Sequence, residues 1–249
     1  MIAIKTVPDI EKMRVAGRIT RGALAEVQKH IAPGVSTWQL DKVAYDYICS
    51  HGARPSFKGY GGFPGSICAS VNDVVIHGIP SKHIILKEGD IISIDVGAYI
   101  GGFHGDAART FPVGQISPEA QKLIDVTRQS FYEGLKFVRE GNRLSDISHA
   151  IGSYCESFGY GVVEDFTGHG VGRALHEDPA VPNFGPAGKG VRLRRGMVLA
   201  IEPMVNMGTK NVKVLDDEWT TVTCDHKLAA HYENTVLITS GEPELLTVL

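Results

Sequence analysis

Two aspartates lie on either side of a predicted turn and could together hold a metal ion. Residues 91–96 form an apolar segment that contains Asp95, and residues 103–111 are predicted to return antiparallel to it after a turn at Gly101. If the turn is centred on the bond before Gly101, Asp95 lies directly opposite Asp106, and residues paired in this way have Cβ atoms ~4.5–5.5 Å apart. Two ionised carboxylates that close in an apolar setting repel each other unless a proton or a cation lies between them.

The pair by itself leaves several interpretations open. Two divalent ions ~3.5–4 Å apart, bridged by carboxylates, would balance both charges. A dyad that shares one proton would also remove the repulsion. If the turn register is off by one residue, either aspartate is instead an ordinary capped or salt-bridged residue.

Three further residues, in the second half of the chain, favour the metal. Residues 198–201 form an apolar strand that ends in Glu202, an acid where burial should exclude one, and Glu233 opens another apolar strand at 235–239. His169 lies in GHGVG, where flanking glycines let the backbone approach a ligand closely. No lysine or arginine is predicted to neutralise these acids, so a two-metal site is the favoured interpretation. Oxygen-rich ligation with a single imidazole suits Mn, Fe(II), Co or Zn.

An internal repeat divides the chain into two similar halves. Three pairs of glycines are each 107 residues apart, namely Gly34 and Gly141, Gly52 and Gly159, and Gly89 and Gly196. After the third pair, each half has an apolar strand that ends in an acid, Asp95 or Glu202. A His-x-x-Pro sequence precedes each strand, starting at His77 and at His176. The repeat therefore predicts one domain, with halves of roughly 1–115 and 116–249.

Each half is predicted to begin with a pair of helices ahead of its strands. Hydrophobic residues recur at helical spacing after each start signal, and the second start is a capping box completed by Gln39. The four helices are predicted to begin at Thr6, Ser36, Ser117 and Ser145, and to end near Gly34, Gly52, Gly141 and Gly159.

Composition excludes several classes of protein. With 25 Lys+Arg and 28 Asp+Glu the net charge is −3, and 43% of the residues are hydrophobic, which is globular rather than disordered composition. There is no basic excess for nucleic acid binding. No apolar run reaches the ~18 residues of a membrane span, and the amino terminus gains charge too early for a signal peptide. The four cysteines form no CxxC pair, so no disulfide framework is expected and the predicted compartment is the reducing cytoplasm.

The acids and histidines occur in sequence contexts that resemble the type I methionine aminopeptidases. These contexts are Asp95 in IDVGA, Asp106 in FHGDAARTF, His169 in GHGVG, Glu202 in AIEP, Glu233 in YENT, His77 in VNDVVIHGIP and His176 in ALHEDP. The resemblance covers about 10–245 and implies an α+β pita-bread fold, in which two pseudo-symmetric αβ halves surround a curved antiparallel sheet. It also implies that the protein removes the N-terminal initiator methionine from nascent proteins and peptides when the second residue is small.

The resemblance further implies a role for each of these residues. The five metal ligands would be Asp95, Asp106, His169, Glu202 and Glu233, and the cofactors would be two divalent ions (Co, Mn, Fe(II) or Zn). Asp106 and Glu233 would bridge the ions, and a metal-activated water would attack the first peptide bond. Glu202 would also act as general base, His77 would contact the scissile amide from the leaving-group side, and His176 would polarise its carbonyl.

A methionine pocket is expected from the same resemblance. Its lining would be Tyr60, Phe63, Cys68 and Trp219, with Phe57 nearby. Aromatic rings and sulfur suit a thioether side chain. The chain differs from common family patterns here, because Phe57 stands where cysteine is frequent and Phe63 where tyrosine is frequent, which affects the expected pocket shape.

Two other functions remain open at this point. A proline-directed exopeptidase of the same fold, such as aminopeptidase P or prolidase, would carry a sizeable extra amino-terminal domain. A non-catalytic pita-bread module that binds protein N-termini would lack the ligand set. The expected partners are N-terminal methionine peptides, with contact to the ribosome compatible with nascent substrates, and the expected state is a cytoplasmic monomer without nucleic acid or membrane binding.

Overall fold

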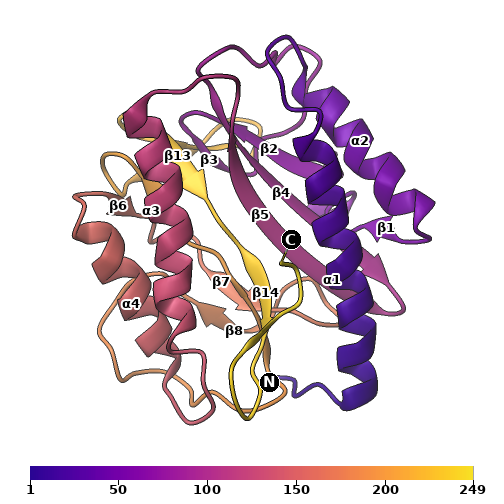
Figure 1. Cartoon of the computed structure of the whole chain (residues 1–249), viewed down its shortest axis with the longest axis vertical. Helices are drawn as coiled ribbons and strands as arrows, with labels where there is room; N and C mark the ends of the chain where they lie inside the picture. The colour runs from indigo at the N-terminus through magenta and orange to yellow at the C-terminus, as the bar shows by residue number, and fades with distance from the viewer. Residues whose placement is uncertain (249) are drawn as a thin grey trace.

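Two pairs of α-helices cover the outside of a layer of antiparallel strands (Figure 1) in the computed structural model, which describes residues 1–248. The helices are α1 (Val7–Gln28), α2 (Thr37–Ser50), α3 (Pro118–Leu135) and α4 (Leu144–Glu156). The strands are β1 (Arg54–Pro55), β2 (Ile67–Val71), β3 (Val74–Ile76), β4 (Ile91–Ile100), β5 (Phe103–Pro112), β6 (Gly161–Val162), β7 (Gly168–Gly170), β8 (Glu177–Val181), β9 (Val198–Ile201), β10 (Met204–Asn206), β11 (Val212–Val214), β12 (Thr221–Thr223), β13 (Ala229–His231), β14 (Asn234–Leu237) and β15 (Glu244–Leu245). The expected α+β class is confirmed.

The helix starts follow the capping signals of the sequence with one exception. Thr6 and Ser36 both form capping boxes, and the Ser117 side chain accepts from the backbone of the first turn of α3. The predicted start at Ser145 is wrong, because Arg143 is the N-cap of α4 and its backbone N–H donates to Asp146. The predicted ends of α1 near Gly34 and of α3 near Gly141 are also wrong, since these helices already end at Gln28 and Leu135.

Corresponding hydrogen bonds show that the two halves have the same backbone arrangement. The N–H of Gly34 donates to the carbonyl oxygen of Leu86 at 2.8 Å, and the N–H of Gly141 donates to that of Leu193 at 3.0 Å. Gly34 and Gly141 are 107 residues apart, and so are Leu86 and Leu193. Both glycines have positive φ, 89° and 94°. The isolated bridges Ser36–Ile85 and Arg143–Arg192 are related by the same shift. These pairs support the repeat inferred from glycine spacing.

The β4–β5 hairpin has a different register from the predicted one. Asp95 pairs with Ala108, and Asp106 pairs with Gly97, because the turn consists of residues 101–102. The prediction that the two aspartates lie directly opposite each other is therefore wrong by two residues. Side chains alternate along a strand with a period of two, so a shift of two leaves both aspartates on the same face as diagonal neighbours.

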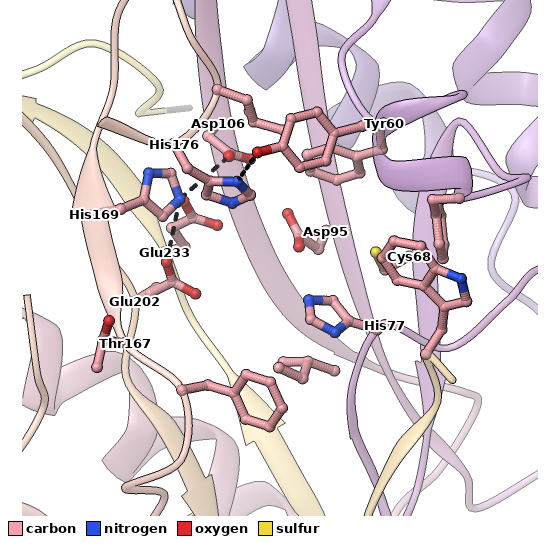
Figure 2. A pocket seen from close by; sticks show the side chains of 16 residues that line it. Tyr60, Cys68, His77, Asp95, Asp106, Thr167, His169, His176, Glu202 and Glu233 are labelled. Atoms are coloured by element: carbon pink, nitrogen blue, oxygen red, sulfur yellow. Dashed lines mark hydrogen bonds and ion pairs between the residues drawn. The ribbon is translucent and has the colours of Figure 1, made fainter. Parts of the chain in front are cut away.

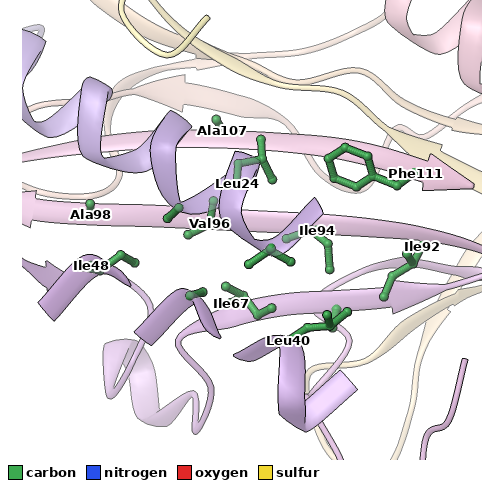
Figure 3. Close-up of a cluster of buried hydrophobic side chains, with 14 of the residues drawn as sticks. Leu24, Leu40, Ile48, Ile67, Ile92, Ile94, Val96, Ala98, Ala107 and Phe111 are labelled. Atoms are coloured by element: carbon green, nitrogen blue, oxygen red, sulfur yellow. The ribbon is translucent and has the colours of Figure 1, made fainter. Parts of the chain in front are cut away.

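The opposite face of this hairpin forms a hydrophobic core with α1 and α2 (Figure 3). Ile92, Ile94 and Val96 of β4 alternate with Asp95 and are fully buried. Leu24 of α1 packs in the same cluster. Burial of such side chains contributes roughly 1.5–3 kcal/mol each, and it fixes which face of β4 presents the aspartate.

An insertion distinguishes the second half from the first. Gly97 pairs with Asp106 in the first half, and Met204 pairs with His231 in the second. Gly97 and Met204 are 107 residues apart, whereas Asp106 and His231 are 125 apart. The 18 extra residues include the β11–β12 hairpin, and β12 pairs with β3 of the first half.

Two threonines join the halves along β5 and β13–β14, which lie side by side in Figure 1. The Thr235 hydroxyl accepts from the N–H of Asp106 at 2.9 Å and donates to its carbonyl oxygen at 2.8 Å. Reciprocally, the Thr110 hydroxyl accepts from the N–H of His231 at 2.9 Å and donates to its carbonyl oxygen at 3.0 Å. Thr110 and Thr235 are also 125 residues apart, so the two contacts are equivalent in the repeat.

Within residues 1–248, no helix combines the length and the apolar character needed to cross a bilayer.

We expect Thr235→Val to lower the free energy of unfolding by about 1–3 kcal/mol, because it leaves two buried backbone groups of Asp106 without a partner. Urea unfolding of the two proteins measures the difference. Thr235→Ser retains the hydroxyl and serves as the control, which should lose less. Equal stability of the valine variant and the parent would show that the contact does not hold the halves together.

Candidate metal centre and active site

One cavity of about 290 Å³ collects side chains from both halves (Figure 2). Its lining is Phe57, Tyr60, Phe63, Cys68, Ile76, His77, Asp95, Asp106, Phe166, Thr167, His169, Leu175, His176, Glu202, Trp219 and Glu233. Every site residue predicted from the sequence is in this set. Ile76, Phe166, Thr167 and Leu175 are additional lining residues that were not anticipated.

Acids and a histidine from separate strands converge at one end of the cavity (Figure 2). Asp95 and Asp106 come from β4 and β5 and His169 from β7, while Glu202 directly follows β9 and Glu233 directly precedes β14. Ligand atoms of Asp106, His169 and Glu233 all lie within 4.8 Å of one another. Residues in or next to five different strands thus supply one compact set of metal-binding atoms.

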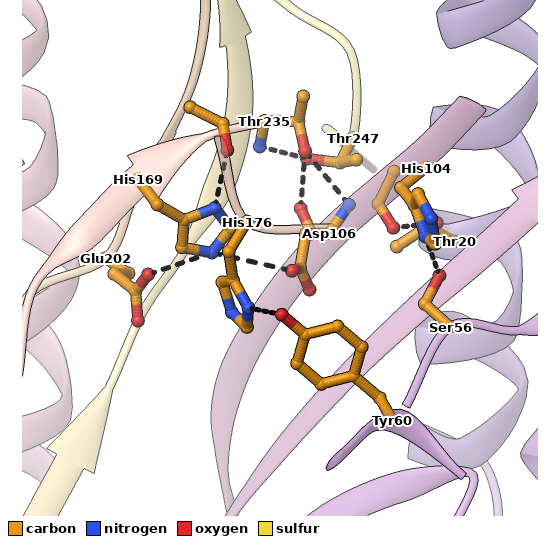
Figure 4. Close-up of polar contacts among 12 residues, drawn as sticks. Thr20, Ser56, Tyr60, His104, Asp106, His169, His176, Glu202, Thr235 and Thr247 are labelled. Carbon is orange, nitrogen blue, oxygen red and sulfur yellow. Dashed lines mark hydrogen bonds and ion pairs between the residues drawn. The ribbon is translucent and has the colours of Figure 1, made fainter. Parts of the chain in front are cut away.

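The orientation of His169 fits a cation between it and two carboxylates (Figure 4). Its Nδ1 lies 2.8 Å from the carbonyl oxygen of Gly170, so Nδ1 carries the proton and Nε2 keeps a lone pair. That Nε2 lies 3.5 Å from Oε1 of Glu202 and 3.8 Å from Oδ2 of Asp106. A lone pair that faces two carboxylates is repelled unless a proton or a cation lies among them.

The carboxyl groups are buried without compensating charges. Asp106 and Glu233 are 3% and 2% exposed, and Oδ1 of Asp95, Oδ1 of Asp106 and Oε1 of Glu233 have no hydrogen-bond partner. Burial raises the pKa of Asp95 to about 7 and that of Glu202 to about 8. Burial together with the neighbouring acids raises the pKa values of Asp106 and Glu233 well above the ordinary value of a carboxyl group.

Arg109 is the basic residue beside this cluster, but it does not neutralise it. Its guanidinium donates to the carbonyl oxygens of Ala108 and Glu233 and to Oδ1 of Asn234. Among residues 1–248, no lysine or arginine forms an ion pair with any of the five predicted ligands. Oxygen-rich donors in this arrangement fit a divalent cation rather than a salt bridge.

The glycines around His169 were predicted to let a ligand approach the backbone, but their structural role is a different one. A Cβ atom at Gly168 would collide with the carbonyl oxygen of Ala200 on β9, and one at Gly170 would collide with that of Asp178 on β8. The glycines therefore allow β7 to lie against its two neighbouring strands. The prediction that they admit a ligand close to the backbone is not supported by these contacts.

The two other histidines of the cavity have different neighbours, with His176 beside His169 and His77 beside Trp219 (Figure 2). Nδ1 of His176 lies 2.7 Å from the hydroxyl of Tyr60, and its ring meets that of His169 edge-on with centroids 4.2 Å apart. His77 has φ of 59°, a strained conformation for a residue with a side chain, and its ring packs edge-on against Trp219. Burial lowers the pKa of His77 to about 4 and also lowers that of His176, so both rings are neutral near pH 7.

The far end of the cavity is apolar. Phe57, Phe63, Cys68 and Leu175 form a buried cluster with Trp219 packed against it. The rings of Phe63 and Trp219 meet edge-on with centroids 5.1 Å apart. The sequence prediction of an aromatic and sulfur-lined pocket describes this end, whereas Tyr60 is 45% exposed and lies beside His176 at the rim.

Sequence reasoning missed one residue that contacts a predicted metal ligand. His231 is 2% exposed, and its Nε2 lies 3.5 Å from Oε2 of Glu202. Glu202, His231 and Glu233 form a second group whose ligand atoms lie within 4.8 Å of one another. The sequence contains one indication of this position. His231 precedes Glu233 by two residues, and alternate residues of an extended segment share a face.

We expect Gly168→Ala to destabilise the protein by about 1–3 kcal/mol, since its methyl group would push β7 away from β9. Gly241→Ala is the matched control, because a Cβ there has only the Thr239 hydroxyl within 4 Å. Urea unfolding of both variants measures the effect. If the two substitutions have the same effect, the close strand contact is not what requires glycine.

Comparisons with known proteins agree with this geometry. Residues 11–240 match metallopeptidase family M24. The methionine aminopeptidase of Clostridium acetobutylicum is 58% identical over 248 residues, which cover 100% of this chain and 99% of that protein. The crystal structure of a methionine aminopeptidase from Thermotoga maritima is similar with a TM-score of 0.98 at 47% identity, over 100% of both chains. A prolidase from Pyrococcus furiosus shares the fold, with a TM-score of 0.79 at 22% identity over 99% of this chain and 65% of that one. The chain therefore belongs to metallopeptidase family M24 and, within it, to the methionine aminopeptidases.

Proposed function

We propose that this cavity hydrolyses the first peptide bond of chains that begin with methionine and releases the free amino acid. The observation that carries the proposal is the pairing of two unlike ends in one 290 Å³ space, with clustered acids and His169 at one end and an aromatic, sulfur-containing lining at the other. The apolar end suits a thioether side chain, while the acidic end suits a free α-amino group. Only the first residue of a chain presents both groups together.

We propose that five side chains hold two divalent cations, with Asp106 and Glu233 shared between them. His169 and Glu202 would complete the donors of one ion, and Asp95 those of the other. The lone pair of His169 and the unpartnered carboxylate oxygens support this arrangement. Divalent ions in such a site supply Lewis acidity, which polarises a carbonyl and lowers the pKa of a water molecule. The donors are compatible with Mn, Fe(II), Co or Zn.

The chain's own residues would then move protons and stabilise charge. Glu202 lies at the acid cluster with a raised pKa and would accept the proton of the attacking water. His176 would donate a hydrogen bond from Nε2 to the carbonyl oxygen as negative charge develops there, with its Nδ1 held by Tyr60. His77, which lines the same cavity beside Trp219, would contact the scissile amide from its leaving-group side.

The second residue of the substrate is expected to be small. Tyr60 and His176, joined by their 2.7 Å contact, flank the cavity at its rim. A substrate held by its methionine side chain and α-amino group would place its second residue beside them. We further propose that the chain acts as a monomeric single domain on nascent chains, with both halves contributing residues to the site.

The alternative functions are less compatible with these features. A binding module has no need for four largely buried acids and a metal-ready histidine, a set that is costly to bury unless it coordinates a cation. The likeness to prolidase is at 22% identity and concerns the fold alone. A proline-directed enzyme would discriminate at the second residue, and the shaped apolar end here lies at the first.

We expect metal-loaded protein to release methionine from Met-Ala-Ser, but not from the N-acetylated peptide, because acetylation removes the amine that the acidic end recognises. Met-Lys-Ser tests the size limit at the second residue and should be cleaved far more slowly. Chromatographic detection of free methionine measures all three. Equal rates for the free and acetylated peptides would contradict recognition of the α-amino group, and faster cleavage of Ala-Pro-Ser would favour the proline-directed alternative.

Glu202→Gln should reduce kcat by at least about 10²–10⁴-fold, because it removes both a negative ligand and the base. Methionine release under saturating metal measures this loss. Glu156→Gln, on the exposed side of α4, is the matched control and should retain the parent rate. Turnover of the Glu202 variant within a few-fold of the parent would rule out the assignment.

A further inference from the structure

The two oxygens of the Glu202 carboxylate each face a different imidazole. Nε2 of His169 lies 3.5 Å from Oε1, and Nε2 of His231 lies 3.5 Å from Oε2. His169 borders the cavity, whereas His231 lies behind Glu202 and borders a second cavity of about 330 Å³ on the other side. Glu202 is therefore held between one ring on the cation side and one ring on the far side.

The repeat places His231 where the first half has a proposed ligand. Asp106 pairs with Gly97 in the first half, and His231 pairs with Met204, the counterpart of Gly97, in the second. Asp106 is the diagonal neighbour of Asp95 on the hairpin, and His231 contacts Glu202 from the equivalent position. A histidine thus replaces an acid at this point of the duplicated framework.

The backbone of His231 is fixed, so its ring has a defined position. The Thr110 hydroxyl binds both the N–H and the carbonyl oxygen of His231, and β13 pairs with β10 beside it. Nε2 of His231 is fully buried and has no hydrogen-bond partner in this structure. Among the acids that the structure describes, only the Glu202 carboxylate lies within 4 Å of Nε2 of His231.

His231 and His169 differ in which ring nitrogen can carry the proton. The Nδ1–H of His169 is committed to the Gly170 carbonyl, which leaves its Nε2 as an electron-pair donor. No hydrogen bond from Nδ1 constrains His231 in this way among residues 1–248, so its neutral ring can carry the proton on Nε2. A move of a few tenths of an ångström would bring that N–H into hydrogen-bond range of Oε2.

We propose that His231 is a positioning residue that donates from Nε2 to Oε2 of Glu202 and thereby keeps Oε1 directed at the cation beside His169. The inference rests on the proposed function, because it gives Glu202 its role as ligand and base. Groups that orient a metal ligand in this way commonly contribute about 10–100-fold to metal affinity or activity. His231 itself would not contact the metal or the substrate.

The test compares two replacements of similar size. His231→Leu removes the donor, whereas His231→Gln retains an amide N–H at the distance of Nε2. Val205→Ala is the control, because Val205 is a buried residue of β10 whose side chain packs in the α3–α4 core. Calorimetric titration of the metal-stripped proteins with Mn²⁺ and steady-state kinetics of Met-Ala-Ser cleavage are the measurements.

We expect His231→Leu to weaken Mn²⁺ binding by about 10–100-fold and to lower kcat more than it changes KM, while His231→Gln stays within a few-fold of the parent. Val205→Ala should lose stability but not metal affinity. X-ray absorption of the cobalt-loaded parent should count one imidazole for the centre. The inference is overturned if His231→Leu binds Mn²⁺ like the parent, if His231→Gln is as weak as His231→Leu, or if two imidazoles are counted.

The outcomes also separate this inference from the proposed function. A parent protein that binds no divalent cation and releases no methionine would overturn the proposed function and, with it, the role of His231. A parent that binds Mn²⁺ and cleaves Met-Ala-Ser, with the same affinity and kcat in His231→Leu, overturns the role of His231 alone.

Discussion

The structure depends on holding four carboxyl groups side by side in a buried space where no lysine or arginine balances their charge. Desolvation and mutual repulsion both oppose this arrangement, as the raised pKa values of all four acids show. The scaffold must therefore be rigid enough to keep the acids from moving apart. Hydrophobic packing of α1 and α2 on β4 and β5, and the glycines that let β7 lie against β8 and β9, supply that rigidity.

The duplicated framework explains how the acids are brought together. Each half places acids on one face of an antiparallel strand pair, and the Thr110 and Thr235 contacts join the two faces at equivalent points. Neither half alone forms the complete donor set. A cation that binds donors from both halves would therefore also stabilise their association, because it binds the assembled state and not the unfolded chain.

The sequence was most informative where a feature is local. Capping residues located three of the four helix starts, and the apolar run around Asp95 with its glycine turn located the β4–β5 hairpin. The predicted register was wrong because the turn was centred before Gly101, whereas Gly101 and Gly102, both with positive φ, together form the two-residue turn. His231 was missed for a related reason, since its contact with Glu202 comes from strand pairing and leaves only a two-residue spacing as a trace.

The β11–β12 hairpin affects how the substrate preference of this protein could evolve. It is an addition to the second half without a counterpart in the first, yet it brings Trp219 to the apolar end of the cavity by pairing β12 with β3. The proposed donors of the cations all come from strands outside this hairpin. The lining that contacts the substrate side chain is thus partly separate from the proposed metal ligands. Substitutions in this one hairpin could change which N-terminal residue is accepted while the metal ligands stay the same.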